Sequence, residues 1–339
     1  MKTVLFYNTT AGNAPLVAET VRELSREAIC RVVPFDRHSN RQEAIRAAIG
    51  WMATRWVVAG GDGTIHQVVD VLGERAAEIE LGIVPCGTGN DFARSLDTRP
   101  EDLRSLCLDP EFGTAALVDL MRLTDLTTGR SFRCLNAATG GIGGEMAERI
   151  GSADKRTWGP FAYWASAIGA LTEMREFLIE LGGIDDQGRA FDPETIPLYG
   201  LVASNGRFIG GGFPIAPSAS LDDGRLDITL IPVLPVLELV AAGIAAATGN
   251  IEHSSAIIRR RVRELTIASR PPLPLSVDGE PHVSSAWRFS VEPDALRLVL
   301  PRVAPGLGGS SSLLPPPSVD PVRSSEFGNV RDPESGESR

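Results

Sequence analysis

The sequence predicts two folded domains, an α/β domain with a mostly parallel sheet followed by a β-rich, sandwich-like domain. The first observation behind this prediction is that short apolar runs alternate with amphipathic segments over the first third of the chain, which is typical of a parallel sheet covered by helices on both faces. The second is that strand-like apolar runs separated by glycine and proline dominate after about Thr124. The length of 339 residues also suits two domains.

In the first domain, four short apolar runs predict buried strands at residues 3–7, 31–35, 56–59 and 81–84. Helices are predicted between and after them, at residues 15–29, 41–51, 65–72 and 92–96. The first helix is expected to begin at Asn13 or Pro15 and to bury one apolar face. That face is formed by Leu16, Val17, Val21 and Leu24.

In the second domain, strands are predicted at residues 132–138, 177–181, 198–203, 226–231, 262–267 and 297–300, with helices near 160–174 and 235–248. We expect the domains to span residues 1–124 and 125–302, with a last strand near 297–301 that could return to the first domain. Residues 303–339 are expected to be disordered, because 19 of these 37 residues are Pro, Gly or Ser and few are apolar.

Acidic residues outnumber basic ones by 43 to 33, which gives a formal net charge of −10. This charge argues against a general nucleic-acid binder, which would carry a net basic face. The apolar run at the start of the chain is too short for a secretory leader. The apolar stretch at 230–248 contains Pro232, Pro235 and Glu238, so we expect a buried helix there and not a membrane span. These features predict a cytoplasmic protein.

A glycine-rich loop follows the strand predicted at 56–59 and reads Gly60-Gly61-Asp62-Gly63-Thr64. Glycines let backbone N–H groups approach a phosphate, and the N-terminus of the following helix favours negative charge. A carboxylate there would repel the phosphate unless Mg²⁺ lay between them, which would give Asp62 a metal-binding role. The alternative is that Asp62 only caps the helix.

A second loop of this kind, Gly87-Thr88-Gly89-Asn90-Asp91, follows the strand predicted at 81–84. Thr88 could donate a hydrogen bond to a phosphate oxygen, and Asp91 could orient metal-bound water or cap the helix at 92–96. Two such loops at neighbouring strand ends favour a phosphate site over two unrelated turns. Neither loop is a Walker A motif or a dinucleotide fingerprint, so an NAD-dependent dehydrogenase is disfavoured.

Further motifs follow these two loops. Residues 205–224 contain Asn-Gly, Gly-Gly-Gly-Phe, Ala-Pro and Asp-Asp-Gly segments, and residues 277–280 read VDGE. Together with residues 57–64 (VVAGGDGT) and 85–94 (PCGTGNDFAR), they resemble the catalytic family of diacylglycerol kinases, in its branch of soluble bacterial lipid kinases. The resemblance covers about residues 1–301. It implies a first domain with the fold shared by NAD kinases and diacylglycerol kinases, whose Gly-Gly-Asp-Gly loop is similar.

The resemblance implies a role for each matching residue. It places the ATP site on a strand end and on both loops, at Asn8, Gly60, Gly61, Asp62, Gly63, Thr64, Ile65, His66, Gly87 and Thr88. It implies metal-linked catalytic acids at Asp62, Asp91 and Asp119, and a general base at Glu280. It also implies a structural Mg²⁺ held by Asp223 and by the backbone carbonyls of Ser220 and Arg225.

Lys155 is conspicuous because the chain has only one other lysine, Lys2. It matches a catalytic lysine of the family that precedes a Gly-x-x-x-Tyr pattern, here Gly159 and Tyr163. An ammonium group binds anions differently from a guanidinium, which favours a specific role for this lysine. The alternative is a solvated side chain.

The chain also departs from the pattern of the family. Thr9 follows Asn8 where the family usually has proline, and His66-Gln67 stands where it usually has Asn-Glu. Pro34 stands near the place of a threonine that contacts the nucleotide. These departures concern the adenine and ribose contacts and the choice of nucleotide, and they leave the metal-linked acids and Glu280 in place.

The residues and the resemblance together predict an ATP- and Mg²⁺-dependent kinase that phosphorylates a lipid hydroxyl. Diacylglycerol, which would give phosphatidic acid, is the first candidate substrate, and phosphatidylglycerol or a sphingoid base would suit the same chemistry. Such an enzyme would act at the inner face of the membrane and could form a homodimer. One alternative is an NAD kinase-like enzyme, against which the motif at 210–224 argues. Another is a non-catalytic nucleotide or lipid sensor, against which the intact set of acids argues.

Overall fold

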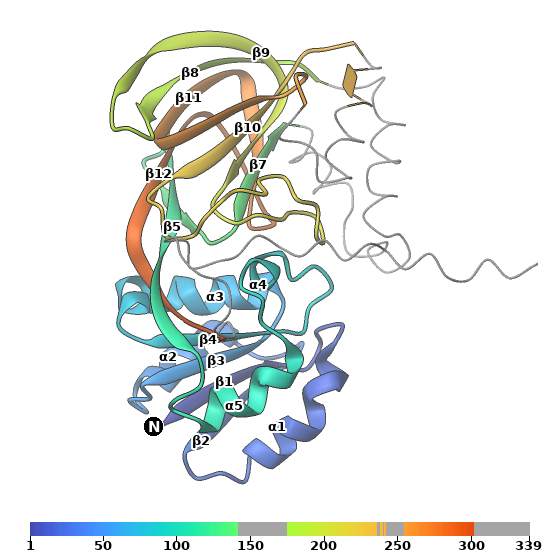
Figure 1. Cartoon of the computed structure of the whole chain (residues 1–339), viewed down its shortest axis with the longest axis vertical. Helices are drawn as coiled ribbons and strands as arrows, with labels where there is room; N and C mark the ends of the chain where they lie inside the picture. The colour runs from blue at the N-terminus through green and yellow to red at the C-terminus, as the bar shows by residue number, and fades with distance from the viewer. Residues whose placement is uncertain (142–174, 236–237, 240, 242–253, 302–339) are drawn as a thin grey trace, which may run out of the picture.

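A computed structural model describes residues 1–141, 175–235, 238–239, 241 and 254–301 (Figure 1). Lys155, the helix predicted at 160–174 and the tail at 303–339 lie outside the described residues, as does most of the helix predicted at 235–248. None of the described helices is long and apolar enough to cross a membrane.

The N-terminal part contains four parallel strands in the spatial order β4-β3-β1-β2. Their bounds are Thr3–Asn8 (β1), Cys30–Phe35 (β2), Arg55–Gly60 (β3) and Glu80–Pro85 (β4). The α-helices are Ala18–Leu24 (α1), Arg41–Ile49 (α2), Asp62–Leu72 (α3), Asp91–Ser95 (α4) and Leu103–Leu108 (α5). Short 3₁₀ helices lie at Ala14–Val17, Gly73–Ala77 and Pro100–Asp102.

β1, β3 and β4 are mainly apolar, as is typical of parallel strands that are buried on both faces, whereas β2 at the edge of the sheet is only partly buried. Successive side chains of a strand point to opposite faces of the sheet. Phe6 and Trp56 therefore pack with α2 and α3 in one core, whereas Leu5 and Val57 pack with α1 and α5 in a second core on the other face. This layering brings the carboxyl ends of β1, β3 and β4 to one edge, where the following loops meet.

The helix predicted at residues 15–29 is wrong in its extent. The chain forms a 3₁₀ helix at Ala14–Val17, and α1 then runs only to Leu24, after which turns lead into β2. The prediction that Leu16 lies on the buried face is also wrong, since Leu16 is 69% exposed whereas Val17 is 2% exposed. Val17, Val21 and Leu24 are spaced four and three residues apart and share one face, which Leu16 misses by one position.

The C-terminal part is built from strands whose mutual pairings are antiparallel around a large apolar core, with a smaller apolar cluster beside it. Its strands are Thr114–Asp125 (β5), Ser131–Cys134 (β6), Ala137–Gly141 (β7), Phe177–Asp185 (β8), Ala190–Ser204 (β9), Leu226–Pro232 (β10), Ile258–Val277 (β11) and Glu280–Leu300 (β12). Several are longer than predicted, because they bend through register shifts while continuing to pair.

The single strand predicted at residues 132–138 is two strands, β6 and β7. The backbone between them leaves the sheet because the N–H groups of Leu135 and Asn136 donate to the carboxylate of Asp278, at 2.7 and 3.1 Å. Asp278 lies in the tight turn between β11 and β12 with a left-handed φ of 46°. The predicted strand is therefore interrupted where its backbone binds the carboxylate of Asp278.

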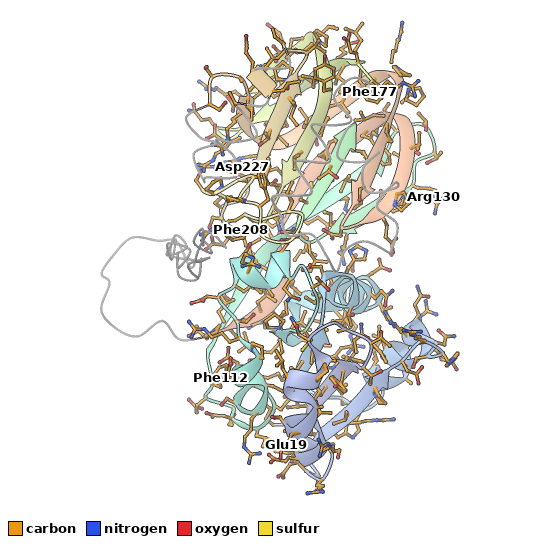
Figure 2. The ribbon with its side chains drawn as sticks, turned by 90° about the vertical axis from the view of Figure 1, so that its right-hand side faces the viewer. Glu19, Phe112, Arg130, Phe177, Phe208 and Asp227 are labelled. Atoms are coloured by element: carbon orange, nitrogen blue, oxygen red, sulfur yellow. The ribbon has the colours of Figure 1, made fainter. Side chains whose placement is uncertain are left out.

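β12 joins the two parts of the molecule. Its first half pairs with β11, and its second half runs down to the parallel sheet, where it pairs with β5 and, through Leu298 and Leu81, with β4. Figure 1 shows β12 and β5 side by side between the two parts, and the turned view in Figure 2 shows the same elongated arrangement. The predicted fold class, an α/β domain with a mostly parallel sheet and a β-rich sandwich-like domain, is confirmed.

Candidate functional site

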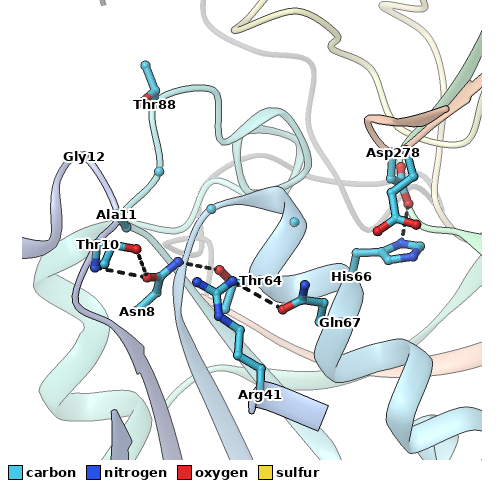
Figure 3. Close-up of a pocket in the computed structure, with 14 residues that line it drawn as sticks. Asn8, Thr10, Ala11, Gly12, Arg41, Thr64, His66, Gln67, Thr88 and Asp278 are labelled. Carbon is cyan, nitrogen blue, oxygen red and sulfur yellow. Dashed lines mark hydrogen bonds and ion pairs between the residues drawn. The ribbon is translucent and has the colours of Figure 1, made fainter. Parts of the chain in front are cut away.

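A cavity of about 360 Å³ lies at the carboxyl ends of β1, β3 and β4, the edge at which ligands of open α/β sheets bind. Both glycine-rich loops and the turn between β11 and β12 contribute to it. It is lined by Asn8, Thr10, Ala11, Gly12, Arg41, Gly61, Gly63, Thr64, His66, Gln67, Gly87, Thr88, Asp278 and Glu280. Figure 3 shows Asn8 and Thr10 on one side, His66 and Asp278 on the other, and Arg41 with Gln67 between them.

The two glycine-rich loops touch through their backbones. A Cβ atom on Gly87 would lie 2.5 Å from Cα of Gly61, and a Cβ atom on Gly61 would lie 3.1 Å from Cα of Gly87. Only glycine fits this approach, so the two motifs recognised in the sequence form one continuous wall of the cavity. Gly60 has a different reason to be glycine, because a Cβ atom there would lie 2.7 Å from Cβ of Thr64 in the first turn of α3.

Asn8 joins the end of β1 to the start of α3. Its Nδ2 donates to Oγ1 of Thr64 at 2.9 Å, and its Oδ1 accepts from the backbone N–H and the hydroxyl of Thr10 at 3.1 and 2.8 Å (Figure 3). Asn8 is almost fully buried, so these bonds replace its contacts with water. The loop after β1 is thereby fixed against the first turn of α3.

Asp62 caps a helix, but not its own. Its two carboxylate oxygens accept from the backbone N–H groups of Asp91 and Phe92, both at 3.1 Å, which are the first amides of α4. The carboxylate of Asp91 in turn accepts from the backbone N–H groups of Gly211 and Gly212, at 3.0 and 2.6 Å. Asp62 and Asp91 therefore connect the first glycine-rich loop, α4 and the glycine run of the C-terminal part.

Both of these carboxylates have raised pKa values. Burial is the main cause for each, and the negative charge of Asp91 also raises the pKa of Asp62. The amide donors act in the opposite direction without cancelling the effect. A cation placed between the two side chains would relieve this electrostatic cost.

Asp119 and Asp223 lie away from the cavity lining. The carboxylate of Asp119 accepts from the backbone N–H groups of Gly224 and Asp294, at 2.7 and 3.1 Å. Asp223 accepts from the N–H of Arg225 at 3.1 Å, and burial together with the charge of Asp227 raises its pKa to about 6. Within the described ranges, no three Asp, Glu, His or Cys side chains are grouped closely enough to hold a metal by themselves.

Of the ten residues predicted to contact the nucleotide, seven line the cavity: Asn8, Gly61, Gly63, Thr64, His66, Gly87 and Thr88. Gly60, Asp62 and Ile65 do not line it, and Ile65 is buried in the apolar core between the sheet and α3. Glu280 lines the cavity, as its catalytic assignment requires. Lys155 lies outside the described residues.

Asp278 belongs to the VDGE motif recognised in the sequence, but sequence reasoning gave it no role in the site. Its side chain is only 4% exposed, and its Oδ2 lies 3.0 Å from Nδ1 of His66 on α3 (Figure 3). The remaining acceptor positions are taken by the N–H groups of Leu135, Asn136 and Ala137 and by the thiol of Cys134. The sequence carries one signal for this pair, since His66 replaces the asparagine that the resembling family usually has.

Arg41 was also missed in the sequence. It begins α2 and lines the cavity, with its guanidinium 5.7 Å from the ring of Phe35 and its Nη1 donating to Oε1 of Gln67 at 3.4 Å. The carboxylates of Asp278 and Glu280 contribute negative charge to the same cavity. Arg41 therefore supplies positive charge on the side of the cavity closest to Gln67.

Comparison with known families agrees with this geometry. Residues 2–123 match the diacylglycerol kinase catalytic domain, and residues 138–300 match the YegS C-terminal NAD kinase beta sandwich-like domain. A relative from Pseudomonas aeruginosa named "Probable lipid kinase YegS-like" is 32% identical over 324 residues, which cover 94% of this chain and 98% of the relative. One of the same name from Xanthomonas euvesicatoria is 36% identical over 263 residues, covering 75% and 81%.

Solved structures share the fold. A crystal structure of a diacylglycerol kinase from Bacillus anthracis superposes with a TM-score of 0.66 at 19% sequence identity, covering 88% of this chain and 96% of that one. A second structure from the same organism gives a TM-score of 0.69 and covers 88% and 95%. At this identity the likeness concerns the fold.

Proposed function

The chain belongs to the YegS-like lipid kinases of the diacylglycerol kinase family, and from that membership we propose that it transfers the γ-phosphoryl group of ATP to the hydroxyl of a membrane lipid. Diacylglycerol is the first candidate acceptor and Mg²⁺ the candidate metal. The observation that carries the proposal is the cavity in which two glycine-rich loops, the start of α3 and Glu280 meet.

The cavity suits a triphosphate. α3 spans eleven residues from Asp62, so its free backbone N–H groups and its dipole favour an anion at its start. Thr88 is exposed at the rim and has a hydroxyl to donate, and Arg41 adds a permanent positive charge. Phosphoryl transfer depends chiefly on such positioning and charge neutralisation.

Asp62 and Asp91 fit a magnesium ion by their chemistry, since they are two partly buried carboxylates that no basic side chain contacts at salt-bridge distance within the described part of the chain. When bound, the ion would neutralise charge on the phosphates. Asp119 is kept as a more distant member of this acidic set. Asp223, with the backbone carbonyls of Ser220 and Arg225, is the proposed ligand set of a structural cation. Burial and the charge of Asp227 raise its pKa even though Arg225 and Arg261 act in the opposite direction.

Glu280 is the proposed acceptor of the hydroxyl proton. It follows the turn between β11 and β12 and is exposed to the cavity, so a lipid hydroxyl could approach it without displacing buried structure. Lys155 remains a predicted catalytic residue. Because the acceptor is a lipid, we propose that the enzyme works at the inner surface of the membrane.

The experiment is to incubate the protein with γ-labelled ATP and separate vesicle preparations that contain diacylglycerol, phosphatidylglycerol or a sphingoid base, with and without Mg²⁺. We expect a labelled lipid that forms only when Mg²⁺ is present, with phosphatidic acid as the first product to look for. Labelling of NAD without any lipid would favour an NAD kinase. ATP binding without transfer to any lipid would favour a sensor, and either result would overturn the proposal.

A further inference from the structure

The contact between His66 and Asp278 fixes the state of both side chains. Asp278 is held by three backbone N–H groups and a thiol, all of them donors, and these donors together with His66 lower its pKa although burial opposes this. A carboxylate in this state can only accept hydrogen bonds. Nδ1 of His66 must therefore carry the hydrogen that bridges the 3.0 Å gap to Asp278.

This leaves Nε2 as the nitrogen of His66 that can gain or lose a proton. No hydrogen bond joins Nε2 to any of the described residues. The side chain is 15% exposed and lines the same cavity as Glu280, which stands two residues after Asp278. An imidazole with one nitrogen held by a carboxylate and the other open to a ligand cavity is the arrangement in which histidine carries protons.

The surrounding charges set the pH range of this histidine. Burial alone would lower the pKa of His66, but Asp278, and then Glu280 and Asp70, raise it above its usual value of 6.5. His282 on β12 also interacts electrostatically with His66, and the pKa of His282 is lowered, first by burial. The imidazole of His66 therefore gains and loses its proton above pH 6.5, where a carboxyl group with an unperturbed pKa is already ionised.

We propose that His66, positioned by Asp278, receives the proton that the lipid hydroxyl releases through Glu280. The inference rests on the proposed function and adds to it a proton-carrying role for His66, which the family resemblance implies only as part of the ATP site. As the bond from the lipid oxygen to the γ-phosphorus forms and the bond from phosphorus to the ADP oxygen breaks, the O–H proton passes to the Glu280 carboxylate. It then passes to Nε2 of His66 and leaves to water after the product departs.

Asp278 is the positioning residue in this scheme. It fixes the hydrogen on Nδ1, so that Nε2 is the basic nitrogen, and it stabilises the imidazolium that forms. His66 must be neutral to receive a proton, so turnover should rise with pH through the pKa of His66 and level off above it. If His66 takes no part in the proton transfer, substituting it should leave the dependence of turnover on pH unchanged.

The test compares kcat against pH for the full chain and for His66→Ala, His66→Asn and His38→Ala, with diacylglycerol vesicles and Mg²⁺-ATP. His38 is an exposed histidine outside the cavity and serves as the matched control. We expect the wild type and His38→Ala to share the same rise, centred above pH 6.5. We expect both His66 variants to lose it, with a plateau about tenfold lower, less than the loss of a sole base because Glu280 remains.

Added imidazole separates a proton-carrying role from a structural one. It should restore part of the rate of His66→Ala and leave the wild type and His38→Ala unchanged. His66→Asn carries the residue usual in the family, so it guards against the alanine variant failing to fold. A rise with pH that persists in His66→Asn, or a folded His66→Ala that does not respond to imidazole, would overturn the inference and leave the proposed function standing. A wild type that phosphorylates no lipid would overturn both.

Discussion

At the scale of single residues, Arg41 offers a direct test of where the nucleotide sits. Among the described residues that line the cavity, one is a lysine or an arginine, and it is Arg41. Its side chain is held by Gln67 and by the ring of Phe35. A hydrogen bond to a charged group contributes about 1.5–3 kcal/mol, so we expect Arg41→Ala to raise the KM for ATP about tenfold or more. Arg37, which is exposed in the loop before α2, is the control. An unchanged KM in Arg41→Ala would place the phosphates elsewhere.

Glu280 can be tested separately from nucleotide binding. Its carboxylate lines the cavity without taking part in the hydrogen bonds that hold the two glycine-rich loops together. We therefore expect Glu280→Gln to bind a non-hydrolysable ATP analogue as tightly as the wild type, while kcat falls about 10²-fold or more. Glu19→Gln, an exposed change on α1, should alter neither quantity. Normal turnover by the Gln variant would remove Glu280 from the reaction.

The sequence could predict those site residues whose role depends on short-range chemistry. Gly61 and Gly87 stand at adjacent strand ends, where the close approach of two backbones requires glycine. A short sequence motif is enough to mark such positions. The pair formed by His66 and Asp278 is different, because the two residues are 212 positions apart and meet only when β11 and β12 return to the sheet. Arg41 likewise looks like an ordinary surface residue at a helix start until the cavity is seen.

At the scale of elements, the acidic residues act mainly by joining segments. Asp62 holds the start of α4, Asp91 holds the glycine run at 211–212, and Asp119 holds the turn that contains Gly224. The sequence pattern predicted acids at a phosphate site, but it could not show which backbone amides they would engage. The metal-linked roles of Asp62, Asp91 and Asp119 remain predictions.

The turn at residues 220–225 gives a prediction about pH and cations. The pKa of Asp223 is about 6 in the folded protein against an ordinary 3.8, because of burial and the charge of Asp227. A raised folded pKa means that this group favours folding when protonated, so its contribution is full below about pH 4 and is lost as the pH rises through 6. We therefore expect Asp223→Asn to raise the melting temperature relative to wild type above pH 6 when no divalent cation is present.

Mg²⁺ provides the second arm of this measurement. If Asp223 holds a cation, Mg²⁺ should raise the melting temperature of the wild type at pH 7 and have a smaller effect on Asp223→Asn. Thermal melts at pH 4 and pH 7, with Mg²⁺ or with a chelator, would check both effects. Equal responses to Mg²⁺ in the two proteins would contradict the assignment of Asp223 as a metal ligand.

The elements themselves were predictable to different degrees. β1, β3 and β4 are buried on both faces, so their apolar runs marked them clearly. The helix at 15–29 was overextended because its apolar spacing continued as far as Ile29, whereas the chain turns after Leu24 to enter β2. The break between β6 and β7 could not be seen, because it is made by the side chain of Asp278 from a distant turn.

At the scale of the whole molecule, β12 makes the two parts depend on one another. Leu296, Leu298 and Leu300 from its end pack in the core beneath α2 and α3, while Trp287 and Phe289 from its first half belong to the core of the β-rich part. The boundary predicted at residue 124 falls at the end of β5, the strand that accompanies β12 between the parts. The sequence suggested that a last strand could return to the first domain, but its length and its role as a shared strand follow only from the pairing.

Leu298→Ala tests this dependence. The side chain is 1% exposed and its residue pairs with Leu81 of β4, so its truncation should cost about 2–5 kcal/mol of unfolding free energy. Leu16→Ala is a matched control, since that leucine is 69% exposed and its loss should stay within about 0.5 kcal/mol.

Because β12 runs through both cores, we expect the loss of stability in Leu298→Ala to extend beyond the N-terminal core. Hydrogen exchange should show amides of β1 and β9 losing protection by similar amounts in Leu298→Ala. Protection lost from β1 alone would mean that the two parts unfold independently and that β12 is only a connection between them.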